Sequence, residues 1–220
     1  TVSRRLAFVV ALLLPLLPSC AKRESTVDRA NRESVLHFSI GSEPSDLDPQ
    51  TVTGVPEHKV IMALFEGLVT EHPKDLSPMP GLAESWTVAD AGKTYVFKLR
   101  GNVKFHDGSA MEAEDVVASI NRVLNKDIGS PLASRLAAVE SARAVDAATV
   151  EIKLKEAQAP FLVSIATIAI VPRRMQADKD SLQKQPMGTG PFSFAEWQPN
   201  SFIRLAKHAG YWGAGQPKLD

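Results

Sequence analysis

Cysteine is almost absent from this 220-residue sequence, and neither sign of charge is in excess. Cys20 is the only thiol, so no disulfide within the chain and no zinc site built from several cysteines is possible. The 25 Lys and Arg residues equal the 25 Asp and Glu residues in number. Binding to a phosphate backbone requires a surplus of cationic side chains, and we therefore expect no nucleic acid partner.

The patterns that mark catalytic, metal and phosphate sites are also missing. The sequence has no Gly-x-Ser-x-Gly elbow, and no two of its five histidines stand three or four residues apart, as two ligands on one helical turn would. His106 and Asp107 are adjacent, so on an extended chain they point in opposite directions, and a turn at Gly108 is expected instead. Residues 187–191 lack the Gly-Lys-Ser/Thr of a phosphate loop. We predict no enzymatic activity, no metal and no cofactor.

The N-terminal segment has the order of an export signal. Arg4 and Arg5 precede an apolar run over residues 6–17, which is short of the roughly 20 residues that span a membrane as a helix. Leu17-Pro18-Ser19-Cys20 then resembles a bacterial lipobox. We expect residues 1–19 to be a signal peptide, Cys20 to carry the lipid, and residues 20–34 to be a polar tether to the membrane. An ordinary signal peptide with an incidental cysteine is the alternative.

Hydrophobic periodicity beyond the tether predicts both helices and strands. Two segments carry apolar residues at helical spacing, and four segments carry the alternation or the β-rich composition of strands. The helices are expected over residues 57–68 and from residue 112 to before residue 129, and the strands over residues 35–40, 94–99, 149–154 and a hairpin within 192–205. Strands and helices do not alternate regularly, which favours a mixed α/β (α+β) fold over a doubly wound sheet.

Nine short motifs occur in an order that resembles one protein family. They are Gly41–Pro49 (GSEPSDLDP), Leu64–Leu68 (LFEGL), Pro80–Trp86 (PGLAESW), Tyr95–Arg100 (YVFKLR), Val103–Gly108 (VKFHDG), Glu114–Val116 (EDV), Ser130-Pro131, Gly188–Phe192 (GTGPF) and Tyr211-Trp212. Together they resemble the family 5 extracellular solute-binding proteins, which include the oligopeptide- and dipeptide-binding receptors of ABC importers.

The resemblance implies a fold, a function and partners. Residues 35–220 would form the N-terminal lobe, apparently truncated, of a two-lobed periplasmic-binding-protein (type II) clamp. The protein would be the extracytoplasmic, lipid-anchored component that captures oligopeptides or dipeptides and delivers them to the permease subunits of an ABC transporter, without changing them chemically.

The resemblance also assigns ligand contacts to two places in the chain. In oligopeptide-binding relatives the loop that corresponds to Thr53, Gly54 and Val55 lies along the ligand like an added strand, so its backbone pairs with peptides of any side chain. Leu132 takes the place of an aromatic residue that contacts the ligand. Such relatives carry an acidic residue in place of Thr53, and the acidic partner of the peptide amino group belongs to the other lobe.

Two further functions remain open from the sequence. The same clamp could hold a non-peptide solute, such as a nickel chelate, haem or a sugar, because Thr53 and Leu132 depart from the peptide-binding pattern. Alternatively, the lobe could act as a surface sensor or adhesin without transport.

Overall fold

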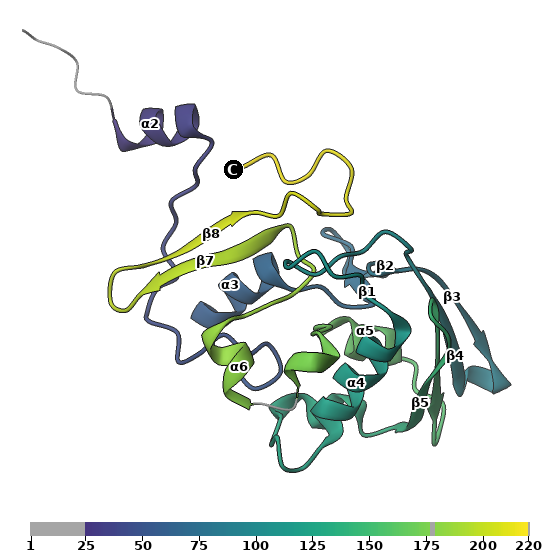
Figure 1. Cartoon of the computed structure of the whole chain (residues 1–220). Helices are drawn as coiled ribbons and strands as arrows, with labels where there is room; N and C mark the ends of the chain where they lie inside the picture. Colours follow the sequence, from purple (N-terminus) through teal and green to yellow (C-terminus); the bar gives the residue numbers. More distant parts are fainter. Residues whose placement is uncertain (1–24, 177–178, 220) are drawn as a thin grey trace, which may run out of the picture. The chain divides into compact units, whose positions relative to one another are not determined.

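A computed structural model describes residues 25–176 and 179–219 of the chain (Figure 1). The chain divides into two compact units, with the boundary between His37 and Phe38. The predicted signal peptide and Cys20 lie outside the described residues. No helix in the described ranges has the length and apolar character needed to cross a membrane.

The described part of the N-terminal unit contains one helix, α2, over Thr26–Glu33. Ser25 caps it, because the Ser25 Oγ accepts the Asp28 N–H at 3.0 Å and donates to Asp28 Oδ2 at 2.7 Å. The segment predicted as a polar tether therefore includes a short capped helix.

The larger unit contains antiparallel sheets and short helices. A four-stranded sheet has the order β3-β4-β6-β5, and β1-β2 and β7-β8 form two-stranded sheets. Every pairing is antiparallel. The elements are α3 Val55–Leu64, β1 Val69–Glu71, β2 Pro78–Pro80, β3 Ala83–Ala89, η1 Asp90–Gly92, β4 Thr94–Leu99, α4 Ala113–Leu124, η2 Pro131–Leu136, β5 Val139–Asp146, β6 Thr149–Leu154, α5 Phe161–Ala166, η3 Arg173–Met175, α6 Lys179–Lys184, β7 Phe192–Gln198 and β8 Phe202–Lys207.

The main hydrophobic cluster lies between the four-stranded sheet and helices α4 and α5 (Figure 1). Strand β4 buries Tyr95, Phe97 and Leu99, and its neighbour β6 places Ile152 opposite Tyr95 and Val150 opposite Phe97. The alternation in these two strands is the pattern of a sheet with one buried face, and both strands have the predicted bounds. The helix predicted from residue 112 to before residue 129 is confirmed as α4, which ends at Leu124.

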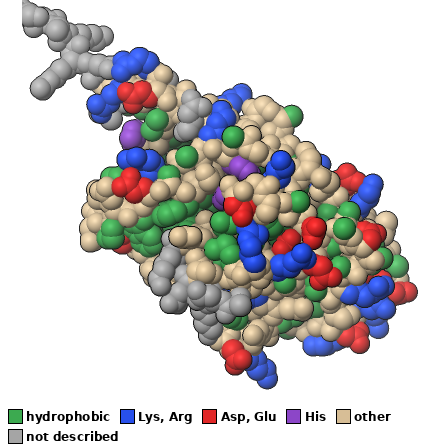
Figure 2. All heavy atoms as spheres, viewed as in Figure 1, with side chains coloured by type: hydrophobic (Ala, Val, Ile, Leu, Met, Phe, Trp, Pro, Cys, Tyr) green, Lys and Arg blue, Asp and Glu red, His purple; other side chains and the backbone are tan. Residues whose placement is uncertain are grey.

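A second hydrophobic cluster joins α3 to the hairpin β7–β8. Val60 and Leu64 of α3 pack there with Val171, and the hairpin contributes the partly buried Phe194 and Ile203. The predicted hairpin within residues 192–205 is thereby confirmed. Figure 2 shows apolar side chains gathered over α3 and this hairpin, whereas charged side chains cover the part that holds the four-stranded sheet.

Two predicted elements differ from the structure. The segment 35–40 is not a strand, because no other described strand pairs with it, and Leu36 and Phe38 are 63% and 59% exposed. The helix expected over residues 57–68 begins at Val55 and ends at Leu64, since Phe65 is already extended. Phe65 and Leu68, the last apolar residues of the predicted helix, are buried, but they lie in an extended segment after α3.

That extended segment lies where the chain crosses between the two clusters. The chain leaves the second cluster at Phe65 and returns to it beyond Ile168, and the Ile170 N–H donates to the Glu66 carbonyl at 3.0 Å. A Cβ on Gly67 would lie only 2.9 Å from the Ala166 carbonyl oxygen. The outgoing and returning chains are therefore in backbone contact, which requires glycine at residue 67.

Glu66 joins three of the sequence motifs at this crossing. Its Oε2 accepts hydrogen bonds from Thr189 Oγ1 at 3.0 Å and from Trp212 Nε1 at 2.9 Å, and its Oε1 accepts one from the Tyr211 hydroxyl at 2.8 Å. Burial raises the pKa of Glu66, and these three hydrogen bonds oppose the rise. Motifs more than a hundred residues apart in the sequence thus share one half-buried carboxylate.

His106 contacts the backbone of the motif at residues 188–192, on both sides of Thr189. The Gly188 N–H donates to His106 Nδ1 at 3.2 Å, so the ring proton is on Nε2, which faces the Gly190 carbonyl at 3.2 Å. Burial lowers the pKa of His106 to about 4 despite the contact with Gly190, so the ring is neutral at neutral pH. The turn expected after Asp107 is present, with Gly108 at a φ of 85°.

We predict that Glu66→Ala lowers the free energy of unfolding by about 2–4 kcal/mol, because it leaves the buried Thr189 and the half-buried Tyr211 and Trp212 without an acceptor. Glu66→Gln keeps an acceptor oxygen and should lose less than half as much. Urea denaturation followed by circular dichroism measures both values. Equal losses in the two variants would contradict a role for the hydrogen bonds.

Candidate ligand-binding surface

The predicted contact residues Thr53, Gly54 and Val55 lie at the protein surface, where the loop ends at Gly54 and α3 begins at Val55. Thr53 is exposed, Val55 is 68% exposed and Gly54 is half-buried. Gly54 has extended backbone angles, with φ −70° and ψ 152°, and is the N-cap of α3. Within the described residues, Thr53 makes no hydrogen bond to another segment. The backbone of this loop is therefore open to a partner on the side away from the protein.

Leu132 is half-buried in η2 and packs against the main hydrophobic cluster. Its N–H donates to Ser130 Oγ at 3.2 Å, and the Ser130 hydroxyl donates to the carbonyl of Gln50. Ser130 stands two residues before Leu132, and Gln50 stands three residues before Thr53. The structure thus brings together the two chain segments that carry the predicted contacts, although it shows no direct contact between Leu132 and the loop.

A buried ion pair fixes the start of the loop. Arg122 of α4 donates from Nη2 to Asp48 Oδ2 at 2.6 Å and from Nη1 to Asp48 Oδ1 at 3.1 Å. The side chains of Arg122 and Asp48 are only 2% and 1% exposed. Two charges taken out of water at this depth are tolerated because each neutralises the other in a bidentate pair.

Gln50 extends this pair into a network across both hydrophobic clusters. Its Oε1 accepts from Arg122 Nη1 at 3.0 Å, and its Nε2 donates to the carbonyls of Ser119 at 3.2 Å and Ala169 at 3.0 Å. The Gln50 N–H also donates to Asp48 Oδ1 at 3.0 Å. The turn at residues 48–50 is therefore bonded to α4 and to the returning chain at once.

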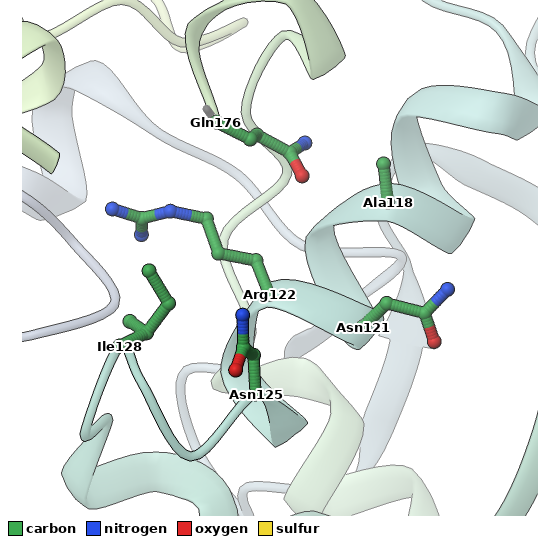
Figure 3. A pocket seen from close by; sticks show the side chains of 6 residues that line it. All are labelled: Ala118, Asn121, Arg122, Asn125, Ile128 and Gln176. Atoms are coloured by element: carbon green, nitrogen blue, oxygen red, sulfur yellow. The ribbon is translucent and has the colours of Figure 1, made fainter. Parts of the chain in front are cut away.

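An open depression of about 380 Å³ lies beside Arg122. Figure 3 shows the Arg122 side chain extending from α4 between Gln176 and Ile128. Ala118, Asn121 and Asn125 complete the lining. In the described part of the chain, the Nε–H of Arg122 lacks a hydrogen-bond partner, but its guanidinium is committed to Asp48 and Gln50. Arg122 therefore supports the surface and does not present its charge to a ligand.

Glu57 lies beneath the exposed loop. Its Oε1 accepts the Ser45 N–H at 2.7 Å and the Ser45 hydroxyl at 3.1 Å, and the residue is only 6% exposed. Burial works to raise the pKa of Glu57, but the hydrogen bonds from Ser45 and from the Glu57 backbone N–H together outweigh it, and the pKa lies below its ordinary value. Glu57 is therefore a carboxylate acceptor at neutral pH.

No group of three or more His, Cys, Asp or Glu side chains is arranged to hold a metal ion in the ranges 25–176 and 179–219. The surface around the loop instead offers main-chain groups and apolar side chains, which suit non-covalent recognition of a ligand.

Comparison with known proteins identifies the family. The family model described as "Bacterial extracellular solute-binding proteins, family 5 Middle" matches residues 77–220. The chain belongs to this family. The family predicted from the nine motifs and the mixed α/β fold are both confirmed.

The relatives of this family 5 protein are solute-binding proteins. The glutathione-binding protein GsiB of Pectobacterium atrosepticum is 33% identical over 186 residues, which cover 83% of this chain and 36% of the relative. The chain therefore spans about a third of the length of the curated relatives that it matches.

Solved structures of two-lobed binding proteins share the fold. AgaA of A. tumefaciens R10, in complex with agropinic acid, is 32% identical, with a TM-score of 0.76 over 81% of this chain and 37% of that chain. The oligopeptide-binding protein AppA of Bacillus subtilis, in complex with a nonapeptide, is 29% identical, with a TM-score of 0.75 over 83% of this chain and 37% of that chain. The family 5 chain thus corresponds to part of a lobe of such proteins.

Sequence reasoning did not find the residues that hold this surface in place. Leu47-Asp48-Pro49 was part of a motif, but Arg122, Gln50 and Glu57 carried no assigned role. A signal for Arg122 was present, because it follows Ser119 and Ile120 and precedes Val123 on the buried stripe of α4. A cation at such a position predicts a buried anion elsewhere in the chain.

We predict that Arg122→Met lowers the free energy of unfolding by about 3–5 kcal/mol, because Asp48 would remain buried without a counter-charge. Adding Asp48→Leu should recover part of this loss, since the double variant buries no charge. Urea denaturation measures each step.

The pair of Arg143 and Glu151, 2.8 Å apart, in which the Arg143 side chain is 59% exposed, provides the matched control. Arg143→Met should cost less than about 1 kcal/mol, as surface ion pairs do. A double variant at Asp48 and Arg122 that is no more stable than Arg122→Met alone would show that the unpaired charge is not the cause.

Proposed function

We propose that this protein is the extracytoplasmic substrate-binding component of a peptide ABC importer. The observation that carries the proposal is the exposed segment Thr53–Val55, in which Gly54 is extended and Val55 begins α3, and whose backbone has no strand partner among the described residues. An extended peptide that lies along such a loop satisfies its amides through the main chain, so one site accepts many sequences. The relatives support this choice, because glutathione is itself a small peptide and AppA holds a nonapeptide.

Transport requires partners besides the peptide. We infer that the permease subunits of the importer recognise the clamp once the ligand has closed it, because a ligand that binds the closed state better shifts the protein toward that state. The protein would bind its peptide without chemistry, and the proposal assigns no cofactor and no nucleic acid partner.

A non-peptide solute is the second candidate. AgaA, with agropinic acid as its ligand, is 32% identical to this chain, whereas AppA with its nonapeptide is 29% identical. Leu132 supplies apolar contact but no ring for stacking and no hydroxyl group. The two candidate functions therefore share the clamp and differ in the chemical class of the ligand.

We expect the full-length gene product to bind short peptides saturably in isothermal titration calorimetry, with a matching rise in melting temperature. A mixture of di-, tri- and oligopeptides serves as the probe, with agropinic acid as the competing non-peptide. Binding of agropinic acid without binding of any peptide would overturn the peptide assignment and support the second candidate.

We further propose that Cys20 anchors the protein to a membrane after removal of residues 1–19. Acyl chains contribute about 0.8 kcal/mol per buried methylene, so a multiply acylated cysteine holds a protein on a bilayer. Cys20→Ser should move the protein from the membrane fraction to the soluble extracytoplasmic fraction, and mass spectrometry of the mature N-terminus should find the lipid only in the wild type. Soluble wild-type protein without the lipid would favour an ordinary signal peptide.

A further inference from the structure

No strand in the described ranges pairs with the exposed loop, so another contact must hold its backbone in one conformation. Glu57 is the side chain that reaches it from below. A Cβ built on Gly54 would lie 1.9 Å from Glu57 Oε2 and 2.8 Å from Glu57 Cδ, so the carboxylate lies directly against the Gly54 backbone. Thr53 and Val55, on either side, remain exposed.

The other end of this contact is fixed. Glu57 Oε1 accepts two hydrogen bonds from Ser45, at 2.7 and 3.1 Å. Ser45 belongs to the segment 41–50, which is attached at two more points. Glu43 Oε1 accepts the Trp197 Nε1–H of β7 at 2.7 Å, and Asp48 pairs with Arg122 of α4. Glu57 stands in the first turn of α3, directly after the exposed loop, and its carboxylate lies against Gly54, so it connects this end of the loop to a segment that both hydrophobic clusters hold.

The need for glycine at residue 54 comes from this contact and not from the backbone angles. A φ of −70° with a ψ of 152° is open to every residue type. Space is the constraint, because a methyl group at residue 54 would occupy the position of the Glu57 carboxylate. The displaced atoms are the far end of a flexible side chain, so an alanine would push Glu57 away from Ser45 and leave the fold intact.

We propose that Glu57 is the positioning residue of the ligand-contacting loop, and that Gly54 is required because it leaves room for the Glu57 carboxylate. The inference rests on the proposed function, in which Thr53, Gly54 and Val55 pair with the ligand main chain. Hydrogen bonds weaken steeply when donor and acceptor are misaligned, so a loop freed from Glu57 pairs less well. Because Glu57 acts on main-chain pairing, it sets the affinity for all peptides alike and not the choice among them.

The test compares peptide dissociation constants of the full-length gene product and its variants by calorimetry. Glu57→Ala should weaken binding roughly tenfold, the equivalent of about one lost hydrogen bond, and by the same factor for peptides with different side chains. Glu57→Gln keeps the oxygen that accepts from Ser45 and should recover most of the affinity. Glu114→Ala, an exposed glutamate in the first turn of α4, is the matched control and should bind as the wild type does.

A double-mutant cycle with Gly54 separates positioning from general destabilisation. Gly54→Ala should weaken binding about as much as Glu57→Ala, and the variant with both changes should be no weaker than either alone, because both remove the same contact. Melting temperatures verify that each variant is folded. If Glu57→Ala does not fold, Gly54→Ala and Ser45→Ala, which removes one of the two hydrogen bonds, take its place.

The outcomes distinguish this inference from the proposed function. A wild-type protein that binds no peptide overturns the proposed function and this inference with it. A wild type that binds peptides, with losses that multiply in the double variant or with no loss in either single variant, overturns the role of Glu57 alone. Losses that differ strongly between peptides would show that Glu57 acts on side-chain recognition instead.

Discussion

Arg122 and Asp48 form a pair in which neither partner is stable without the other. Each side chain is almost completely buried, and the effective cost of taking either ion out of water is several kcal/mol. The pair offsets this cost only when the bidentate geometry is complete, so α4 and the turn at residue 48 have one relative position. Gln50 transmits that position to the returning chain at Ala169. The surface built on this turn therefore has a defined geometry before any ligand is present.

The same principle recurs at two other acidic side chains. Glu66 collects three donors from the motifs near the end of the chain, and Glu57 collects two from Ser45. In each case a carboxylate binds a segment that is 12 or more residues away in the sequence. A buried carboxylate has strict hydrogen-bonding requirements, and these requirements specify the path of the backbone more sharply than apolar packing does.

Regular elements could be predicted from the sequence wherever local pattern and burial agree. The bounds of β4 and β6 followed from alternation, because one face of each strand meets the core and the other does not. The end of α3 could not be predicted, since Phe65 and Leu68 keep helical spacing although Gly67 needs an extended path against Ala166. Residues 35–40 have a strand's composition, but pairing depends on a neighbour that the local sequence does not reveal.

Less of the candidate site could be predicted from the sequence. Thr53, Gly54, Val55 and Leu132 came from family resemblance, and they stay predictions. The residues that support them are charged or polar and buried, and their partners lie 12 to 119 residues away. Local periodicity contains no information at such separations. Only the position of Arg122 on an apolar stripe hinted at a buried partner.

The contact at Gly67 has a topological consequence. Because the outgoing and returning chains touch there, the part between them, with the four-stranded sheet and its two helices, starts and finishes at one point. It has the topology of an inserted module, and such modules are added or lost during evolution without rerouting the host, since the ends to be rejoined are already neighbours. The surface around Thr53 lies outside this part but is bonded to it through Arg122 and Ser130, so those two contacts must persist while the rest of the module diverges in sequence.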